Sequence, residues 1–351
     1  MTVSVSNRKK VAELAGVSEA TVSRVLNGIG PMKESTRQRV LAAAKELNYE
    51  LNAIASSFAR GRSCNLGVVL PHVPKVHLFS TYYFSEILSG IGEAVRAKDY
   101  GLLLLFRDPN GTYDYASLFR TQRIDACIVL GASAIATERE SISRMAGKQL
   151  PFCVMDQHFD GLDVSMVQTD HVQGSYAAVK HLLAQGHKRI GFLNGSPQYS
   201  NSVDRLTGYR QALEEAGIAF NESIVYRGNY SRKSGFLAAE AVYSSLAMLD
   251  ALFVANDRMA IGLMQGMREL GCKFPEDLPI VGYDDSDAAS MTEPPLTTVR
   301  VPFYEMGRLA AERLLDRLSD PESETATFNE LLQTELIVRK SCAAHRSGEA
   351  R

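Results

Sequence analysis

Three closely spaced residues, Glu19, Ala20 and Arg24, carry side chains that could contact the edges of DNA bases. An arginine can pair with O6 and N7 of guanine, a glutamate can accept from N4 of cytosine, and an alanine methyl can contact the methyl of thymine. Helical spacing places all three off the apolar stripe that contains Val22 and Val25, so a partner could reach them. The alternative is that they form the solvated surface of an ordinary helix.

Two short helices around a tight turn must position these side chains. Val11, Leu14 and Ala15 recur at helical spacing and predict the buried face of a first helix. Gly16 ends that helix, because glycine readily adopts the left-handed backbone of a helix C-terminus, and the hydroxyl of Ser18 caps the second helix. This pattern is typical of a helix-turn-helix, whose second helix enters the major groove of DNA. A helical hairpin packed against another element is the alternative.

The sequence AxxAGVSxxTVSRVLN, residues 12–27, closely resembles the DNA-binding motif of the LacI/GalR family of bacterial transcription regulators. The resemblance implies that Glu19, Ala20 and Arg24 are the base-reading positions. Contacts to the DNA backbone fix the register of the protein without reading sequence. We expect such contacts from Thr21, Ser23, Asn27 and Arg60.

A third helix is predicted from Glu34 to Asn48, with Val40 and Leu41 on its buried face and with Lys33 where the family usually has a capping serine. The residues after it resemble the family's hinge, where a short helix forms when two subunits sit together on DNA. Phe58 replaces the leucine that usually wedges into the minor groove, and phenylalanine can also unstack a base step. The expected minor-groove residues of the hinge are Asn52, Ala55 and Phe58.

From Asn65 onward, short apolar strands alternate with amphipathic helices. This alternation predicts an α/β body with parallel sheets covered by helices on both faces, and the number of units indicates two doubly wound lobes. The resemblance implies the same body, like that of a periplasmic sugar-binding protein. The predicted strands are Leu66–Leu70, Gly101–Phe106, Ala126–Leu130, Phe152–Met155, Arg189–Asn194, Ala251–Ala255 and Pro279–Tyr283. Predicted helices include Phe84–Lys98, Gly174–Gln185, Arg205–Ala216, Lys233–Leu246 and Arg258–Leu270.

The domain boundaries follow from these elements and from the resemblance. We expect a helix-turn-helix domain over residues 1–50, a hinge and linker over 51–64, an effector-binding and dimerisation domain over 65–340, and a polar tail over 341–351. The resemblance implies three crossings between the lobes, expected near residues 164–168, 294–299 and 325–330. Lobe 1 would then comprise about 65–165 and 297–327, and lobe 2 about 166–296 and 328–340.

Polar side chains follow several predicted strands, where ligands bind in such folds. Asp156, Asn256 and Asp284 each come after a strand, and Arg205 lies at a helix start. Two carboxylates, an amide and a guanidinium suit a polyhydroxylated ligand, whose hydroxyls donate and accept. Capping, a turn or simple packing are the structural alternatives. The positions that match the family's effector-binding residues are Tyr83, Phe84, Asp156, Arg205, Asn256 and Asp284.

Composition limits the other classes of function. The net charge is −2, yet residues 1–62 hold ten Lys or Arg and five Asp or Glu, so a basic head precedes an acidic body. The five cysteines are far apart and form no metal-ligand spacing. No apolar run approaches the ~20 residues that span a membrane, and the N-terminus has no secretion signal. We expect a cytoplasmic protein without metal, cofactor or membrane contact.

An enzymatic function is not expected. Gly90 and Gly92 lie inside a predicted helix and lack the third glycine of a dinucleotide-binding fingerprint. The chain contains no P-loop, GxSxG or HExxH motif, and its seven histidines are scattered.

The sequence therefore predicts a transcription regulator that binds an operator in double-stranded DNA. We expect a repressor of carbohydrate-utilisation genes that a sugar or sugar derivative, bound between the lobes, releases from a palindromic operator. The tail lacks the leucine heptads of an added tetramer helix, so a homodimer is expected. A purine-type corepressor or an activator remains an alternative, and a solute-binding protein is a more remote one.

Overall fold

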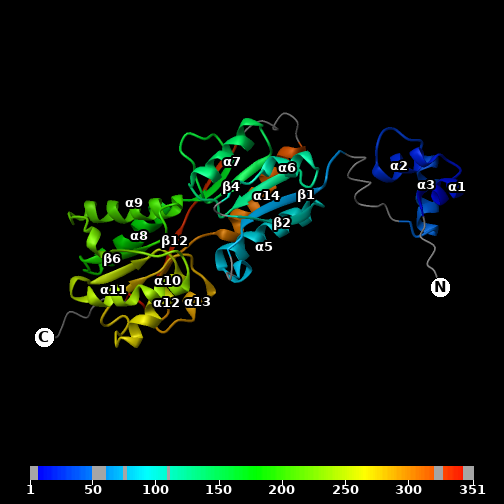
Figure 1. Cartoon of the computed structure of the whole chain (residues 1–351). Coiled ribbons are helices and arrows are strands. Elements are labelled where there is room, and N and C mark those ends of the chain that lie inside the picture. The colour runs from blue at the N-terminus through cyan, green and yellow to red at the C-terminus, as the bar shows by residue number, and fades with distance from the viewer. Residues whose placement is uncertain (1–6, 50–60, 74–76, 109–110, 320–326, 343–351) are drawn as a thin grey trace.

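The structure is a computed structural model that describes residues 7–49, 61–73, 77–108, 111–319 and 327–342 of the 351-residue chain. Figure 1 shows a small helical head near the N-terminus and a larger α/β body. The head consists of α1 (Arg8–Ala15), α2 (Glu19–Asn27) and α3 (Glu34–Glu46).

The first two helices of the head have the boundaries that the sequence indicated, and α3 begins at Glu34 as predicted but ends at Glu46, two residues earlier than expected. The side chains of Asn7 and Ser18 cap α1 and α2 by accepting backbone N–H groups, and Gly16 ends α1 with φ 64°. Lys33 precedes α3 and gives it no side-chain cap. The predicted helix-turn-helix is therefore present.

The core of the head differs in part from the prediction. Leu14 and Leu41 were expected to be buried but are 49% and 45% exposed, while Ala12 and Ala43 are buried. The prediction was wrong because helical spacing in such short helices is compatible with two adjacent faces. Contacts of α1 with both α2 and α3 select the face that contains Ala12. The centre of the head is formed by three fully buried valines, Val11, Val22 and Val40.

Lobe 1 of the body is built on a parallel sheet with strand order β11-β5-β4-β3-β1-β2. Leu66 and Val68 in one strand share a core with Ile87, whereas Val69 shares a different core with Ile142, so helices cover both faces. The strands are β1 (Asn65–Pro71), β2 (Gly101–Arg107), β3 (Ala126–Leu130), β4 (Phe152–Met155), β5 (Met166–Thr169) and β11 (Asn329–Leu332). The helices are α5 (Tyr82–Ala97), α6 (Tyr115–Arg120), α7 (Ala136–Gly147) and α14 (Phe303–Ser319), with the 3-10 turn η1 (Leu78–Ser80).

Lobe 2 contains a parallel sheet with strand order β7-β6-β8-β9 and a separate antiparallel pair, β10 and β12. The single helix predicted over residues 233–246 is instead two helices that meet at Ala238. The strands are β6 (Ile190–Asn194), β7 (Val225–Arg227), β8 (Ala251–Val254), β9 (Ile280–Val281), β10 (Thr298–Arg300) and β12 (Glu335–Ile337). The helices are α8 (His171–Ala184), α9 (Ser200–Glu215), α10 (Arg232–Leu237), α11 (Ala239–Ser244), α12 (Asp257–Glu269) and α13 (Asp287–Ser290), with the 3-10 turns η2 (Glu222–Ile224) and η3 (Leu246–Met248).

The chain passes between the lobes three times, each time a few residues later than predicted. β5 pairs with β4, and β11 pairs with β5, so residues 166–169 and 329–332 belong to lobe 1 rather than lobe 2. β10 was assigned to lobe 1, but it pairs with β12 and is bridged to the strand region of lobe 2. The sequences MVQT and NELL are short and mix polar with apolar residues, so they gave no strand signal.

Two glycines explain why α5 and α14 pack closely. A Cβ on Gly90 would lie 2.0 Å from the carbonyl oxygen of Tyr304, and a Cβ on Gly307 would lie 2.1 Å from that of Ile87. Backbone therefore contacts backbone where the helices cross. Gly90 lies inside a helix, as predicted, and its role there is packing.

A buried ion pair fastens α7 to the sheet of lobe 1. Nη1 of Arg107, at the end of β2, lies 2.8 Å from a carboxylate oxygen of Glu138, and both side chains are almost fully buried. The hydroxyl of Tyr115 donates to the same carboxylate at 2.6 Å, and Nη2 of Arg107 donates to the carbonyl of Gly131 at 2.8 Å. Burial raises the pKa of Glu138, with Arg107 opposing that effect.

Replacing Glu138 with alanine should therefore destabilise lobe 1 strongly. The variant leaves the guanidinium of Arg107 buried without its counter-charge, which costs about 3 kcal/mol or more. Glu140→Ala is the matched control, because Glu140 lies on the same helix, is exposed and pairs with Arg144 at 3.5 Å, so a change of about 0.5 kcal/mol or less is expected. Urea unfolding of the two variants measures the difference, and equal losses would contradict the assignment.

Candidate functional site

A cavity of about 320 Å³ lies between the lobes, at the carboxyl ends of their parallel strands. Its wall from lobe 1 includes Pro71 at the end of β1, the start of α5 and Asp156 after β4. Its wall from lobe 2 includes the starts of α9 and α12. All six residues predicted to bind an effector line this one cavity: Tyr83, Phe84, Asp156, Arg205, Asn256 and Asp284.

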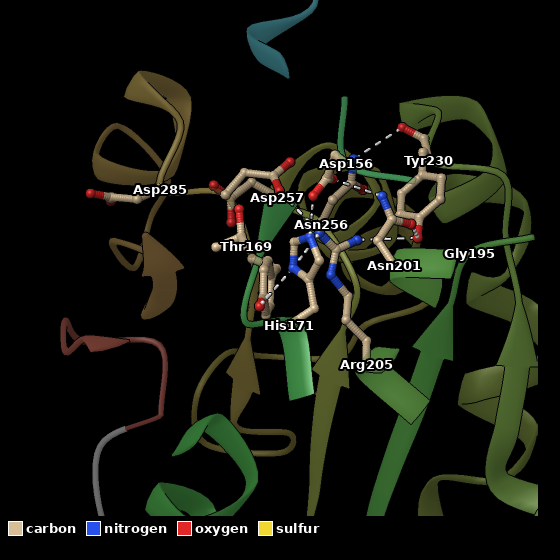
Figure 2. Close-up of polar contacts among 12 residues, drawn as sticks. Asp156, Thr169, His171, Gly195, Asn201, Arg205, Tyr230, Asn256, Asp257 and Asp285 are labelled. Atoms are coloured by element: carbon tan, nitrogen blue, oxygen red, sulfur yellow. Dashed lines mark hydrogen bonds and ion pairs between the residues drawn. The ribbon is translucent and has the colours of Figure 1, made fainter. Parts of the chain in front are cut away.

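The carboxylate of Asp156 connects the two lobes. One oxygen lies 2.8 Å from Nε2 of His171, and the other accepts from Nδ2 of Asn201 at 3.0 Å. Asp156 belongs to lobe 1, whereas His171 and Asn201 belong to lobe 2. Figure 2 shows the three side chains meeting. Burial raises the pKa of Asp156, but His171 and the guanidinium of Arg205 outweigh it and hold that pKa below its usual value. An ionised Asp156 therefore joins the lobes at the cavity.

The sequence did not indicate His171. Its ring is 2% exposed, and Nδ1 lies 3.1 Å from the hydroxyl of Tyr283 and 3.4 Å from Nη2 of Arg205. His171 comes two residues after β5. Polar residues that follow a strand are candidates for ligand binding, but β5 was not predicted as a strand, so His171 was not considered.

Arg205 holds a fixed position in the wall. Its guanidinium lies 4.2 Å from the centre of the Tyr283 ring, and Nη1 donates to the hydroxyl of Tyr230 at 3.1 Å. Burial lowers the pKa of Arg205, but Tyr230, Tyr283 and Asp284 more than compensate and raise it. A cation stacked on an aromatic ring and held by a hydroxyl keeps its remaining donors in a defined direction.

Asp284 and Asn256 have different roles in the same wall. Asp284 has φ 107°, an unusual backbone for a residue other than glycine, and lies 4.0 Å from Nη2 of Arg205. Asn256 caps α12 by accepting the N–H of Met259 at 2.9 Å, and it donates to the carbonyl of Tyr230 at 3.2 Å. Asn256 therefore caps a helix, where a turn was the structural alternative, and it also lines the cavity.

Aromatic rings form the apolar side of the cavity. Tyr83 packs edge to face against Phe84 and Phe303, with centroid distances of 4.9 and 5.2 Å. Burial raises the pKa of Tyr83 well above its usual value. Several lining residues were not predicted from the sequence, namely Thr81, Tyr199, Asn201, Tyr230, Arg258 and Phe303.

Further contacts between the lobes surround the cavity. Nε2 of His158 lies 3.3 Å from a carboxylate oxygen of Asp204, and the N–H of Ser200 donates to the side chain of Gln157 at 3.0 Å. On the other side, Nη1 of Arg258 donates to the hydroxyl of Thr81 at 3.0 Å. Polar groups of both lobes thus meet around the cavity.

The predicted base-reading residues are exposed on α2. Glu19, Ala20 and Arg24 all face solvent, and Glu19 pairs with Arg8 at 3.2 Å. Of the expected phosphate-contacting residues, Thr21, Ser23 and Asn27 are partly buried. The N–H of Thr21 donates to Ser18, and Nδ2 of Asn27 donates to the carbonyl of Ser23 at 2.8 Å. Their contacts with DNA remain predictions.

The hinge prediction concerns residues that the structure does not describe. Asn52, Ala55, Phe58 and Arg60 all fall within 50–60, outside the described ranges. Among the described residues, no cluster of three or more histidine, cysteine, aspartate or glutamate side chains is suited to hold a metal ion. None of the described helices has the length and apolarity required to cross a membrane.

Comparisons with known proteins bear on both parts of the chain. The family model "Bacterial regulatory proteins, lacI family" matches residues 9–52, and "Periplasmic binding protein-like domain" matches residues 179–342. The "HTH-type transcriptional repressor PurR" of Vibrio campbellii is 32% identical over 337 residues, covering 95% of this chain and 97% of the relative. The chain belongs to the LacI family of bacterial regulatory proteins.

Solved structures of the family agree with this assignment. The Lac repressor dimer bound to operator and the anti-inducer ONPF has a TM-score of 0.80 at 28% identity, covering 96% of this chain and 98% of that one. A transcriptional regulator CelR–cellobiose complex has a TM-score of 0.71 at 30% identity, covering 96% and 99%. The predicted fold, a helix-turn-helix head on a two-lobed α/β body, is confirmed. This LacI-family protein is a DNA-binding transcriptional repressor, and its family is a class of transcription regulators rather than enzymes.

The contact between His158 and Asp204 should make the stability of this repressor depend on pH. The hydrogen bond with Asp204 raises the pKa of His158, burial opposes it, and the charges of Asp204 and Asp160 add to the rise. A raised pKa in the folded state stabilises the protein below the unfolded pKa of about 6.5, and the contribution disappears as pH rises through the folded value.

His158→Gln should therefore lower the thermal midpoint most in acidic buffer and least well above neutrality. Asp204→Asn should reproduce the same pH profile, because it removes the other partner. Thermal unfolding of both variants over a pH series provides the measurement. A destabilisation that is the same at every pH would exclude protonation of His158 as its cause.

Proposed function

We propose that this protein represses carbohydrate-utilisation genes and leaves its palindromic operator when a sugar or sugar derivative binds between the lobes. The observation that carries the proposal is the mixed lining of the cavity. Carboxylates, amides, hydroxyls and a fixed guanidinium surround it, next to the aromatic rings of Tyr83 and Phe84. Sugar hydroxyls donate and accept hydrogen bonds, while the C–H face of a sugar packs on a ring. CelR, bound to cellobiose, and an Enterococcus faecium regulator, bound to ribose, are structural relatives.

The contacts of Asp156 suggest how the ligand would act. A ligand hydroxyl that reaches this carboxylate competes with His171 and Asn201, which belong to the other lobe. Binding would then change the angle between the lobes and, in a homodimer, the spacing of the two hinges. Such coupling typically amounts to about 1–3 kcal/mol. A cytoplasmic dimer with two recognition helices matches a palindromic operator.

A second candidate is a purine-type corepressor, which would strengthen binding to the operator. The observation that favours it is the sequence similarity to repressors named PurR, including that of Haemophilus influenzae at 30% identity over 336 residues.

The role of Arg205 gives a direct test. Full-length protein is heated with a panel of sugars, sugar phosphates and purines. A ligand at a hundredfold excess over its dissociation constant should stabilise the wild type by roughly 2.7 kcal/mol, and Arg205→Met should abolish this gain while operator binding persists. Arg210→Met, an exposed change on the same helix, should retain it. A purine that stabilises the wild type and tightens operator binding would replace the sugar proposal with the second candidate.

Arg24 provides a test of base reading. Arg24→Ala should relax base preference at one position of each half-site and cost about 1–3 kcal/mol on the preferred sequence. Lys45→Ala removes an exposed positive charge from α3 and should leave the preferred sequence unchanged. Selection of bound sequences from random DNA compares the variants. An unchanged consensus for Arg24→Ala would show that Arg24 does not read a base.

A further inference from the structure

Arg258 is a cation on the cavity wall whose charge has no ion-pair partner among the described residues. It lies in the first turn of α12, lines the cavity and, within the described part of the chain, donates only to the neutral hydroxyl of Thr81, at 3.0 Å. Burial lowers the pKa of Arg258, with the more distant Asp284 opposing. By contrast, Arg205 is surrounded by two tyrosines, His171 and Asp284. Arg258 is therefore the cation of this wall that is free to pair with a ligand.

The start of α5 faces the same part of the cavity. Thr81 is the N-cap residue, but its side chain caps no backbone N–H of the helix, and the first turn contains no acidic residue. The next three residues all line the cavity. The first N–H groups of a helix have no internal partner and carry a partial positive charge, which favours an anion. A guanidinium from lobe 2 and a helix N-terminus from lobe 1 thus meet at Thr81.

The carboxylate of Asp284 indicates independently that this cavity holds a ligand. The residue is 7% exposed and lines the cavity, yet no hydrogen bond to its carboxylate is found among the described residues. A buried polar group of this kind normally has a partner. Burial raises the pKa of Asp284 well above its usual value, with Arg205 opposing and Asp257 adding to the rise. The ion pair of Asp284 is with Arg205, and none with Arg258 is found among the described residues, so the charge of Arg258 is left without a counter-charge.

We propose that the effector carries an anionic group, a phosphate or a carboxylate, which binds between the guanidinium of Arg258 and the first turn of α5. This inference rests on the proposed function, which places the effector in this cavity. It narrows the effector to a sugar phosphate or a sugar acid. The anion contacts lobe 2 through Arg258 and lobe 1 through α5. It therefore replaces the Arg258–Thr81 hydrogen bond by a charged bridge between the lobes.

Inorganic phosphate is a probe that needs no knowledge of the effector. Thermal unfolding of the full chain is followed against phosphate, with ionic strength held constant by sodium chloride. Phosphate also stabilises proteins by exclusion from their surface, so the result is the difference between variants. Arg258→Gln should weaken apparent phosphate affinity about tenfold, and Arg258→Lys should weaken it less. Arg232→Gln, which changes a cation of lobe 2 bonded to Gln265 outside the cavity, should behave as wild type.

Equal phosphate responses in the wild type and Arg258→Gln overturn the inference, as does the absence of any specific response. Glucose, glucose 6-phosphate and gluconate then distinguish a neutral sugar, a phosphate and a carboxylate. An anionic sugar should stabilise the wild type more than glucose does, and Arg258→Gln should remove that advantage. If glucose binds best and its binding depends on Arg205 alone, the proposed function stands and this inference fails. If phosphate binding depends on Arg258 but no sugar or sugar derivative binds, the anion site stands and the sugar proposal fails.

Discussion

The buried carboxylate of Asp156 is the constraint on which the arrangement of the body depends. An ionised group that is removed from water must be paired, and the partners of Asp156, His171 and Asn201, come from the other lobe. The lobes therefore cannot separate at this point unless the carboxylate of Asp156 becomes exposed to water or other groups replace its two partners. A ligand with hydrogen-bond donors of its own could replace His171 and Asn201 as the partners of Asp156. The relative position of the two lobes would then depend on what occupies the cavity.

The loop after β9 connects the same cavity to β10 and β12, the strands that lie next to two of the chain crossings. Asp284 faces the cavity, whereas the carboxylate of Asp285 accepts from Arg300 at 2.8 Å and from Arg339 at 2.6 Å. Arg300 ends β10, and Arg339 follows β12. Asp257, whose burial raises its pKa to about 7, accepts from the hydroxyl of Thr298 in β10. Asp284 is therefore next in sequence to a residue that is hydrogen-bonded close to two of the three chain crossings.

Much of this arrangement follows from the sequence, and the exceptions have physical causes. Capping residues and continuous apolar strands are local signals, so the helix-turn-helix and the central strands could be located. The six cavity residues could be named because they match positions of the family that the sequence resembles. His171 depends on β5, a four-residue strand with mixed polarity, and its exact place emerges only from pairing with β4 and β11. Leu14 was misplaced for a similar reason, because contacts with a third helix decide which of two apolar faces is buried.

The position of the linker determines how a change at the cavity can reach the head. The carboxylate of Asp125 accepts from the backbone N–H groups of Ser63 and Cys64, and Arg62 donates to the carbonyl of Leu318 near the end of α14. α14 begins at Phe303 in the cavity wall, and its 17 residues span about 25 Å. The linker is therefore attached to lobe 1 at the end of the sheet away from the cavity. In the proposed mechanism, a change in the angle between the lobes would therefore reach the linker through a displacement of lobe 1, to which the linker is attached.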